Sequence, residues 1–149
     1  MTQPFQSSTL NPNMTLNPFN PQPSTLNPIM NRDTIIALRP KLNIDDNNVS
    51  EVEKFQNKAL RPILKFQHDL IMKLASQKFP ALPKIQQSSE RSSYIMKILN
   101  GQPILNQLFV GVIVGLLSNE ELNFYLENIN ELNKRIKHMI IERIASNSI

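Results

Sequence analysis

Apolar residues beyond position 50 recur every three or four positions, which is the period of an α-helix. Four segments carry this pattern, at 50–79, 89–100, 103–117 and 118–144. Apolar stripes of this kind are stable only when they pack against one another. The sequence therefore predicts an all-α fold, a compact bundle of about four helices that occupies residues 50–146.

The first segment carries a proline inside its apolar stripe. The stripe consists of Val52, Phe55, Ala59, Ile63, Phe66, Leu70 and Leu74, and it is flanked by Leu60, Leu64 and Ile71. Pro62 removes one hydrogen bond of the helical ladder and costs about 3 kcal/mol in a helix interior. Because the periodicity continues across it, we expect one helix, kinked near Lys58 to Pro62, rather than two. Ser50 and Glu53 form a capping box at its start.

The third segment, 103–117, is apolar on nearly every side, which predicts the central element of the core. Pro103 suits its first turn, because the missing amide would have no partner there. Gly111 and Gly115 lie four positions apart and would let another helix approach closely. Just before this segment, Gly101 is expected to end the preceding helix in a left-handed conformation.

The last segment opens with a second capping box, formed by Ser118 and Glu121. Its apolar residues alternate at intervals of three and four. The seam that they form comprises Leu122, Tyr125, Ile129, Leu132, Ile136 and Met139. Such a seam closes a bundle or pairs two subunits. We favour the bundle because the pattern is short, whereas apolar surface left exposed would favour a homodimer.

The first 31 residues differ in kind from the rest. They contain no charged residue, hold six of the eleven prolines, and repeat one phrase ending in Leu-Asn-Pro three times. Proline blocks both helix and sheet ladders, so residues 1–31 are predicted to be a disordered arm. The composition changes abruptly at Met30, which makes Met30 an alternative start of translation. Residues 32–49 are a transition, expected as a short helix or extended segment with apolar anchors on the bundle and a loop at Asp45–Asn48.

The amino-acid composition argues against several classes of functional site. The chain has no cysteine, which excludes disulfides, thiolate catalysis and the common structural zinc sites. His68 and His138 lack the spacing of a metal site, and the three glycines do not form a nucleotide loop. We therefore predict no catalytic residue, no metal and no cofactor. The run from Ile104 to Leu117 is too short to cross a bilayer and no secretory signal is evident, so we expect a cytoplasmic protein without a membrane partner.

Charge is concentrated in one region. The net charge of +4 lies almost wholly within residues 50–87. There, four basic residues are spaced four, three and four apart, which places them on one line opposite the apolar stripe: Lys54, Lys58, Arg61 and Lys65. This line is expected either to bind a polyanion or an acidic protein surface, or to be the solvated back of a bundle helix. The absence of interleaved aromatic residues favours the solvated face.

Two stretches carry a resemblance to a known family. They are Phe55-Gln56-Asn57-Lys58 with Leu60 to Gln67, and Leu132-Asn133-Lys134-Arg135 with Ile141 to Ile144. Over 31–144 the chain resembles a family of short bacterial proteins often labelled glyoxalase. That label implies a metal-dependent enzyme with histidine and glutamate ligands on strands. The sequence supplies neither strands nor such ligands, so no site residue follows from the resemblance.

Three functions are compatible with this sequence. The first is a non-catalytic interaction or regulatory module, with an unknown protein partner or a second copy of itself. The second is an accessory protein that binds RNA or DNA through the basic helix face. The third is an enzyme of the glyoxalase type, which the missing motifs disfavour.

Overall fold

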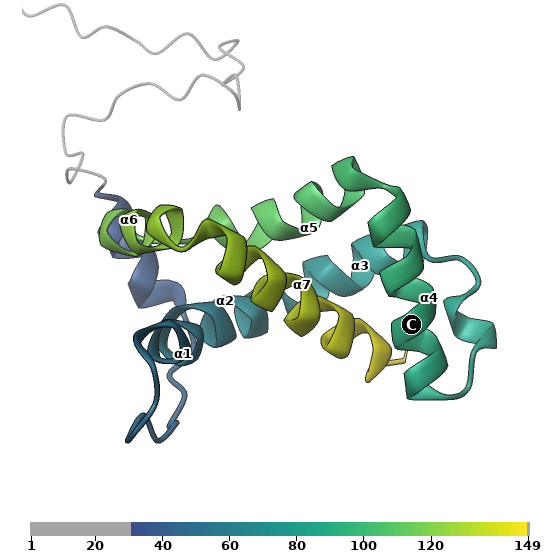
Figure 1. Cartoon of the computed structure of the whole chain (residues 1–149), viewed down its shortest axis with the longest axis horizontal. Coiled ribbons are helices and arrows are strands. Elements are labelled where there is room, and N and C mark those ends of the chain that lie inside the picture. The colour runs from purple at the N-terminus through teal and green to yellow at the C-terminus, as the bar shows by residue number, and fades with distance from the viewer. Residues whose placement is uncertain (1–30, 149) are drawn as a thin grey trace, which may run out of the picture. The chain divides into compact units, whose positions relative to one another are not determined.

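The computed structural model describes residues 31–148, which contain seven α-helices and no strand (Figure 1). In chain order the helices are α1 Glu51–Phe55, α2 Arg61–Phe66, α3 His68–Lys78, α4 Ser88–Gly101, α5 Pro103–Val114, α6 Asn119–Glu127 and α7 Ile129–Ala145. The all-α prediction is confirmed. The count of about four helices is wrong, because the first and the last segment are each divided. The predictions of a disordered arm and of a start at Met30 lie outside the described residues.

The first segment is divided around its proline. Between α1 and α2 the backbone forms one π-helical turn, Gln56–Leu60, and stays right-handed throughout. A regular α-helix cannot continue through Pro62. Its ring would clash with the carbonyl of Lys58, and proline has no amide that could donate to that carbonyl. A π turn widens the helix and avoids this conflict. At Gln67 the backbone leaves the helical region, and α3 begins at the next residue.

These two irregularities change which residues are buried. Phe66 and Leu70, both in the predicted stripe, are exposed. Leu64 and Ile71, which flank the predicted stripe, are buried, as is Ala75. The prediction assumed one continuous helical period, whereas a π turn and a break each rotate the following residues about the helix axis. The buried face is therefore displaced in the second half of the segment.

The last segment is divided at Asn128, whose side chain donates to the Phe124 carbonyl as α6 ends. The longer piece, α7, packs against α3, α4, α5 and α6. Figure 1 shows α7 crossing the middle of the helical domain, with α4 beside its C-terminal half. The prediction that residues 103–117 form the central element of the core is wrong. Helix α5 is buried on one side and exposed along the other, and its buried residues are Leu105, Phe109, Val110 and Ile113. Aromatic rings connect the outer helices to this core, as in the stacked pair Phe79 and Phe109, 5.9 Å apart.

The transition segment forms a 3₁₀ helix, Arg32–Leu38, followed by an extended stretch that leads to α1. None of the residues of the 3₁₀ helix is buried, and Ile35 and Leu42 are partly buried. Arginines attach it instead. Arg32 donates to the carbonyls of Gly115 and Leu117, and Arg39 binds Glu121. The predicted loop at Asp45–Asn48 is present, and Asn48 adopts the left-handed conformation that asparagine tolerates (φ 62°).

Candidate anion-binding site

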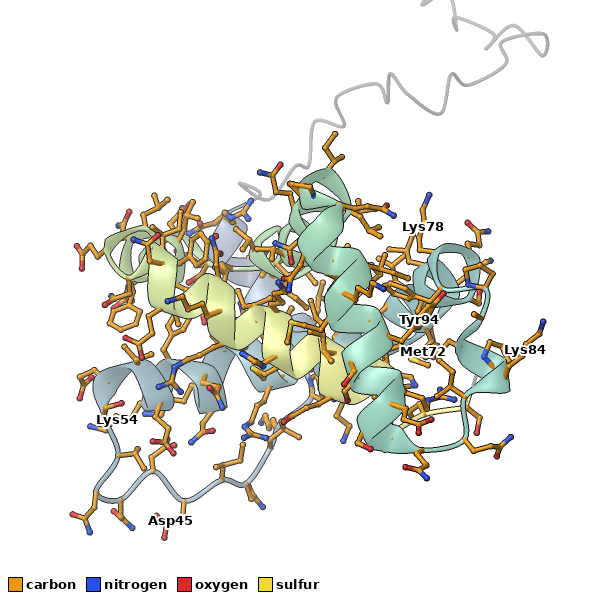
Figure 2. The ribbon with its side chains drawn as sticks, turned by 45° about the vertical axis from the view of Figure 1, so that its right-hand side comes forward. Asp45, Lys54, Met72, Lys78, Lys84 and Tyr94 are labelled. Atoms are coloured by element: carbon orange, nitrogen blue, oxygen red, sulfur yellow. The ribbon has the colours of Figure 1, made fainter. Side chains whose placement is uncertain are left out.

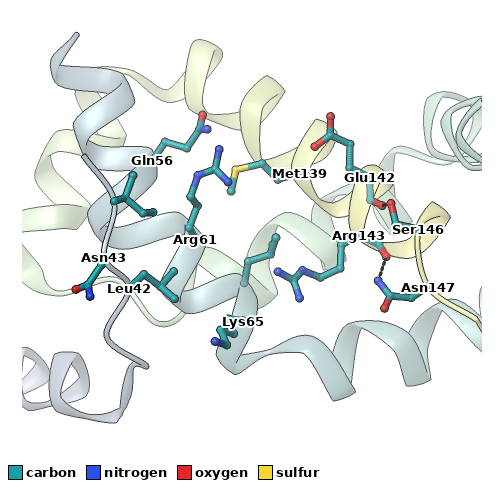
Figure 3. A pocket seen from close by; sticks show the side chains of 12 residues that line it. Leu42, Asn43, Gln56, Arg61, Lys65, Met139, Glu142, Arg143, Ser146 and Asn147 are labelled. Carbon is teal, nitrogen blue, oxygen red and sulfur yellow. Dashed lines mark hydrogen bonds between the residues drawn. The ribbon is translucent and has the colours of Figure 1, made fainter. Parts of the chain in front are cut away.

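A pocket of about 600 Å³ opens between α2, α7 and the extended stretch that precedes α1 (Figure 3). Three cationic side chains line it: Arg61 and Lys65 from α2, and Arg143 from α7. The rest of the lining is apolar or carries amide or hydroxyl groups. These residues are Leu42, Asn43, Ile44, Gln56, Leu64, Met139, Ser146 and Asn147, with Glu142 as the one acidic member.

Two helices position the cations. Arg61 and Lys65 are four residues apart at the two ends of α2, so both project on the same side of that helix. Buried Ile63 and Leu64 fix the orientation of α2 by packing into the core. Arg143 follows the buried pair Ile140 and Ile141 on α7, which places it on the opposite wall. In Figure 3 the guanidinium of Arg143 points toward Lys65, whereas the carboxylate of Glu142 points away from it.

Arg143 has an unusual environment for an arginine. Its Nη1 lies 3.0 Å from Nδ1 of His68, which is the acceptor because an arginine N–H can only donate. Its Nε is buried and has no hydrogen-bond partner among residues 31–148. Burial lowers the pKa of the Arg143 guanidinium below its ordinary value. Burial of a cation costs free energy unless an opposite charge is bound nearby, and Arg143 contacts only an imidazole nitrogen. An anion bound in the pocket would offset this desolvation cost.

None of the ion pairs formed within residues 31–148 involves Arg61, Lys65 or Arg143. Arg61 donates to the side-chain oxygen of Asn57, a neutral acceptor. The three charges therefore face the pocket without a carboxylate bound to any of them. The arrangement can bind a carboxylate or phosphate group through charge-assisted hydrogen bonds, with apolar side chains close by.

The four basic residues predicted to form one line have different surroundings in the structure. Lys54 pairs with Glu51 at 2.8 Å, and Lys58 lies 3.7 Å from Asp46. The π turn Gln56–Leu60, which contains Lys58, changes the helical phase between Lys54 and the pair Arg61 and Lys65. Only Arg61 and Lys65 line the pocket. Polyanion binding by the four together stays a prediction that the structure does not test.

Sequence reasoning missed Arg143 as a member of the site. Arg143 is 78 positions from Lys65 in the sequence. Only the packing of α7 against α3 brings the two residues to the same pocket. His68 lies partly buried beside Arg143, whereas His138 is exposed.

The apolar seam of the last segment packs inside the molecule for most of its length. Tyr125, Leu132 and Ile136 are buried, and Leu122 and Met139 pack against the core. Ile129 is exposed, close to the break between α6 and α7. Self-association through this seam was not tested by the structure, which assigns most of its side chains to the core of one chain.

Within residues 31–148, no three histidine, cysteine, aspartate or glutamate side chains gather closely enough to hold a metal ion. In the same part of the chain, every helix is too short or too polar to traverse a bilayer. No protein-family model matches the chain, and no curated protein or solved structure is significantly similar to it. The resemblance to the glyoxalase-labelled family therefore stays a prediction.

Proposed function

We propose that the chain is a non-catalytic binding module that recognises an acidic segment of a partner protein in the pocket between α2 and α7. The observation that supports this proposal is the set of three cations, Arg61, Lys65 and Arg143, that share one pocket and are bound to no carboxylate within residues 31–148. Leu42, Leu64 and Met139 give the same pocket apolar walls. A glutamate or aspartate flanked by apolar residues matches both features.

The distribution of charge favours a protein over a nucleic acid. A nucleic acid presents phosphates along an extended line, and a protein that binds it distributes its cations along that line. Here Lys54 and Lys58, the two members of the predicted basic line that lie outside the pocket, are paired with carboxylates. Arg61, Lys65 and Arg143 are gathered around one concave site instead. A single acidic side chain or short acidic segment fits such a site better than a polyanion backbone does.

The experiment is a pull-down from native lysate with the full chain as bait, repeated with the triple variant Arg61→Gln, Lys65→Gln, Arg143→Gln. The matched control changes three lysines outside the pocket, Lys73→Gln, Lys78→Gln and Lys84→Gln, and so alters the net charge equally. Figure 2 shows Lys78 and Lys84 at the outer edge of the molecule, pointing away from it. Circular dichroism verifies that both triple variants are folded.

We expect an identified protein to be captured by the wild type and by the control, and at least roughly tenfold less of it by the pocket variant, since charge-assisted hydrogen bonds contribute about 1.5–3 kcal/mol each. Nuclease treatment should leave the capture unchanged. Capture that disappears with nuclease would favour the nucleic-acid function. Equal losses in both triple variants would overturn the pocket as the binding site.

A further inference from the structure

The contact between His68 and Arg143 depends on the protonation state of the histidine. Arg143 Nη1 lies 3.0 Å from His68 Nδ1, and an arginine can only donate, so Nδ1 accepts and carries no proton. This is the one hydrogen bond that the Arg143 guanidinium forms within residues 31–148, where its buried Nε has no partner. The observed contact therefore requires a neutral His68.

Protonation of His68 would change this contact in two ways. An imidazolium carries a hydrogen on both ring nitrogens, so Nδ1 could no longer accept from Arg143. The ring would also place a second positive charge beside the guanidinium, and the two would repel each other. Both changes favour an anion in the pocket, because the Nη1 hydrogen becomes available to it and the added charge attracts it.

Cationic groups come near His68 from both of the helices, α2 and α7, that pack against α3. Helix α7 contributes Arg143. Helix α2 contributes Lys65, three positions before His68, and Arg61 one turn earlier, and both line the pocket. Helix α5, which accepts a hydrogen bond from the Gln67 side chain, contains no charged residue. A proton on His68 would therefore add to a cluster that is already positive.

Two carboxylates lie close to this cluster in the sequence, and neither is bound to it. Asp69 follows His68 on α3 and is exposed. Glu142 precedes Arg143 on α7, and its carboxylate points away from Lys65 (Figure 3). None of the ion pairs formed within residues 31–148 includes His68, Asp69 or Glu142. A protonated His68 would thus have no carboxylate bound to it, and an anion in the pocket would supply the missing counter-charge.

We propose that pH regulates the pocket through His68: protonation of this ring and binding of an anion by Arg61, Lys65 and Arg143 favour each other. The inference rests on the proposed function and adds a regulator to the same site. Histidine is the side chain whose ordinary change of charge falls between pH 5 and 8. Coupling between two binding events is reciprocal, so the anion binds more tightly in mildly acidic solution, and the bound anion holds the proton on His68.

The first test measures the affinity of the full chain for sulfate, which stays a dianion in this pH range, by nuclear magnetic resonance titration at constant ionic strength. We expect the wild type to bind sulfate at least about fivefold more tightly at about pH 5.5 than at about pH 7.5. His68→Gln keeps an oxygen that can accept from Arg143 but cannot be protonated, so it should lose this difference. The matched control is His138→Gln, which removes the other, exposed histidine and should behave like the wild type.

The second test leaves His68 in place, so it decides the question even if His68→Gln does not fold. In the His138→Gln variant His68 is the only histidine, and its ring protons report its titration directly. With saturating sulfate the midpoint of this titration should move to higher pH, by about 0.7 pH unit for a fivefold coupling. The same variant with Arg61→Gln, Lys65→Gln and Arg143→Gln should show no such shift. Circular dichroism verifies that each variant is folded.

The outcomes separate this proposal from the function on which it rests. Sulfate binding that depends on the three cations but is equally tight at both pH values would overturn the coupling and leave the pocket as the binding site. An equal pH dependence in the wild type and in His68→Gln would assign it to other groups and overturn the role of His68. Sulfate that fails to bind the wild type, or that binds the triple variant equally well, would overturn the anion site and the coupling together.

Discussion

Glu121 performs two tasks at the start of α6. Its side chain accepts from the Ser118 backbone amide at 2.8 Å, which completes the predicted capping box. The same carboxylate accepts two hydrogen bonds from Arg39, at 2.7 and 2.6 Å. The side chains are 6% exposed for Arg39 and 18% for Glu121, so solvent screens this pair little. One carboxylate therefore caps a helix and attaches the N-terminal segment to it.

This arrangement predicts a pH-dependent contribution to stability. Burial alone would raise the pKa of Glu121, but the hydrogen bonds from Arg39 and Ser118 outweigh it and hold the pKa below its ordinary value of 4.5. A carboxyl whose pKa is lowered on folding stabilises the protein above its unfolded pKa, and the stabilisation is lost as pH falls through the folded pKa. Glu121→Gln should cost about 2 kcal/mol at neutral pH and nothing below both pKa values. Urea unfolding from neutral pH to below pH 4.5 measures this difference.

The control for this prediction is Glu120→Gln, at the exposed neighbouring position in the same first turn. It loses only a small interaction with the helix dipole, of about 0.5 kcal/mol. If the stability curves of the wild type and of Glu121→Gln ran parallel over the whole pH range, the lowered pKa would be contradicted.

At the scale of elements, the C-terminal end of α5 has Gly115 as its C-cap in a right-handed conformation, and side chains bind its last carbonyls. No glycine within residues 31–148 has a positive φ, and the last carbonyls of α5 and of the turn after it need other partners. Gln67 donates to Val112, and Arg39 donates to Leu116. Arg32 donates to Gly115 and Leu117, at 2.8 and 2.7 Å. Two arginines also complement the negative end of the helix dipole.

We therefore expect Arg32→Gln to loosen the end of α5 locally. The loss of two charge-assisted hydrogen bonds at a partly exposed site should cost about 1 kcal/mol. Hydrogen exchange should accelerate at the amides of Leu116 and Leu117, while amides in the middle of α7 are protected as before. Lys97→Gln, at an exposed position of α4, serves as the control. Unchanged exchange at both amides would show that Arg32 does not order this turn.

At the scale of the whole molecule, α7 joins the other helices into one unit. It packs against α3, α4, α5 and α6, and its buried residues include Leu132, Ile136 and Ile140. A helix that contacts four others cannot leave the core without disrupting all of them. The helical domain is therefore expected to unfold as one cooperative unit.

The measurement is urea unfolding followed by far-ultraviolet circular dichroism and by tyrosine fluorescence. Tyr94 lies on α4 and Tyr125 on α6, at different sides of α7, so fluorescence reports two regions at once. Both signals should give the same midpoint and the same slope. Two separate transitions would show that α6 and the segment before α1 form an independent unit, and would contradict the central role of α7.

Local signals in the sequence predicted some residues well. The Ser118 and Glu121 capping box is present in full, and Ser50 accepts from the Glu53 amide as expected. Arg61 and Lys65, two of the four residues of the predicted basic line, lie four positions apart and both line the pocket, and binding by them stays a prediction. These features depend on residues within four positions of one another. Short-range patterns specify them because the backbone geometry of a helix fixes the distances involved.

The sequence by itself determined the helical class, since apolar residues at the helical period cannot be buried on one face by any other regular backbone. Only the tertiary structure decided the rest. Pro62 shifts the helical phase by an amount set by a π turn, so Phe66 became exposed and Ile71 buried. Arg143 reached the pocket, and Arg32 reached the end of α5, through contacts between distant segments. Such contacts depend on how helices pack, and no spacing within one helix contains that information.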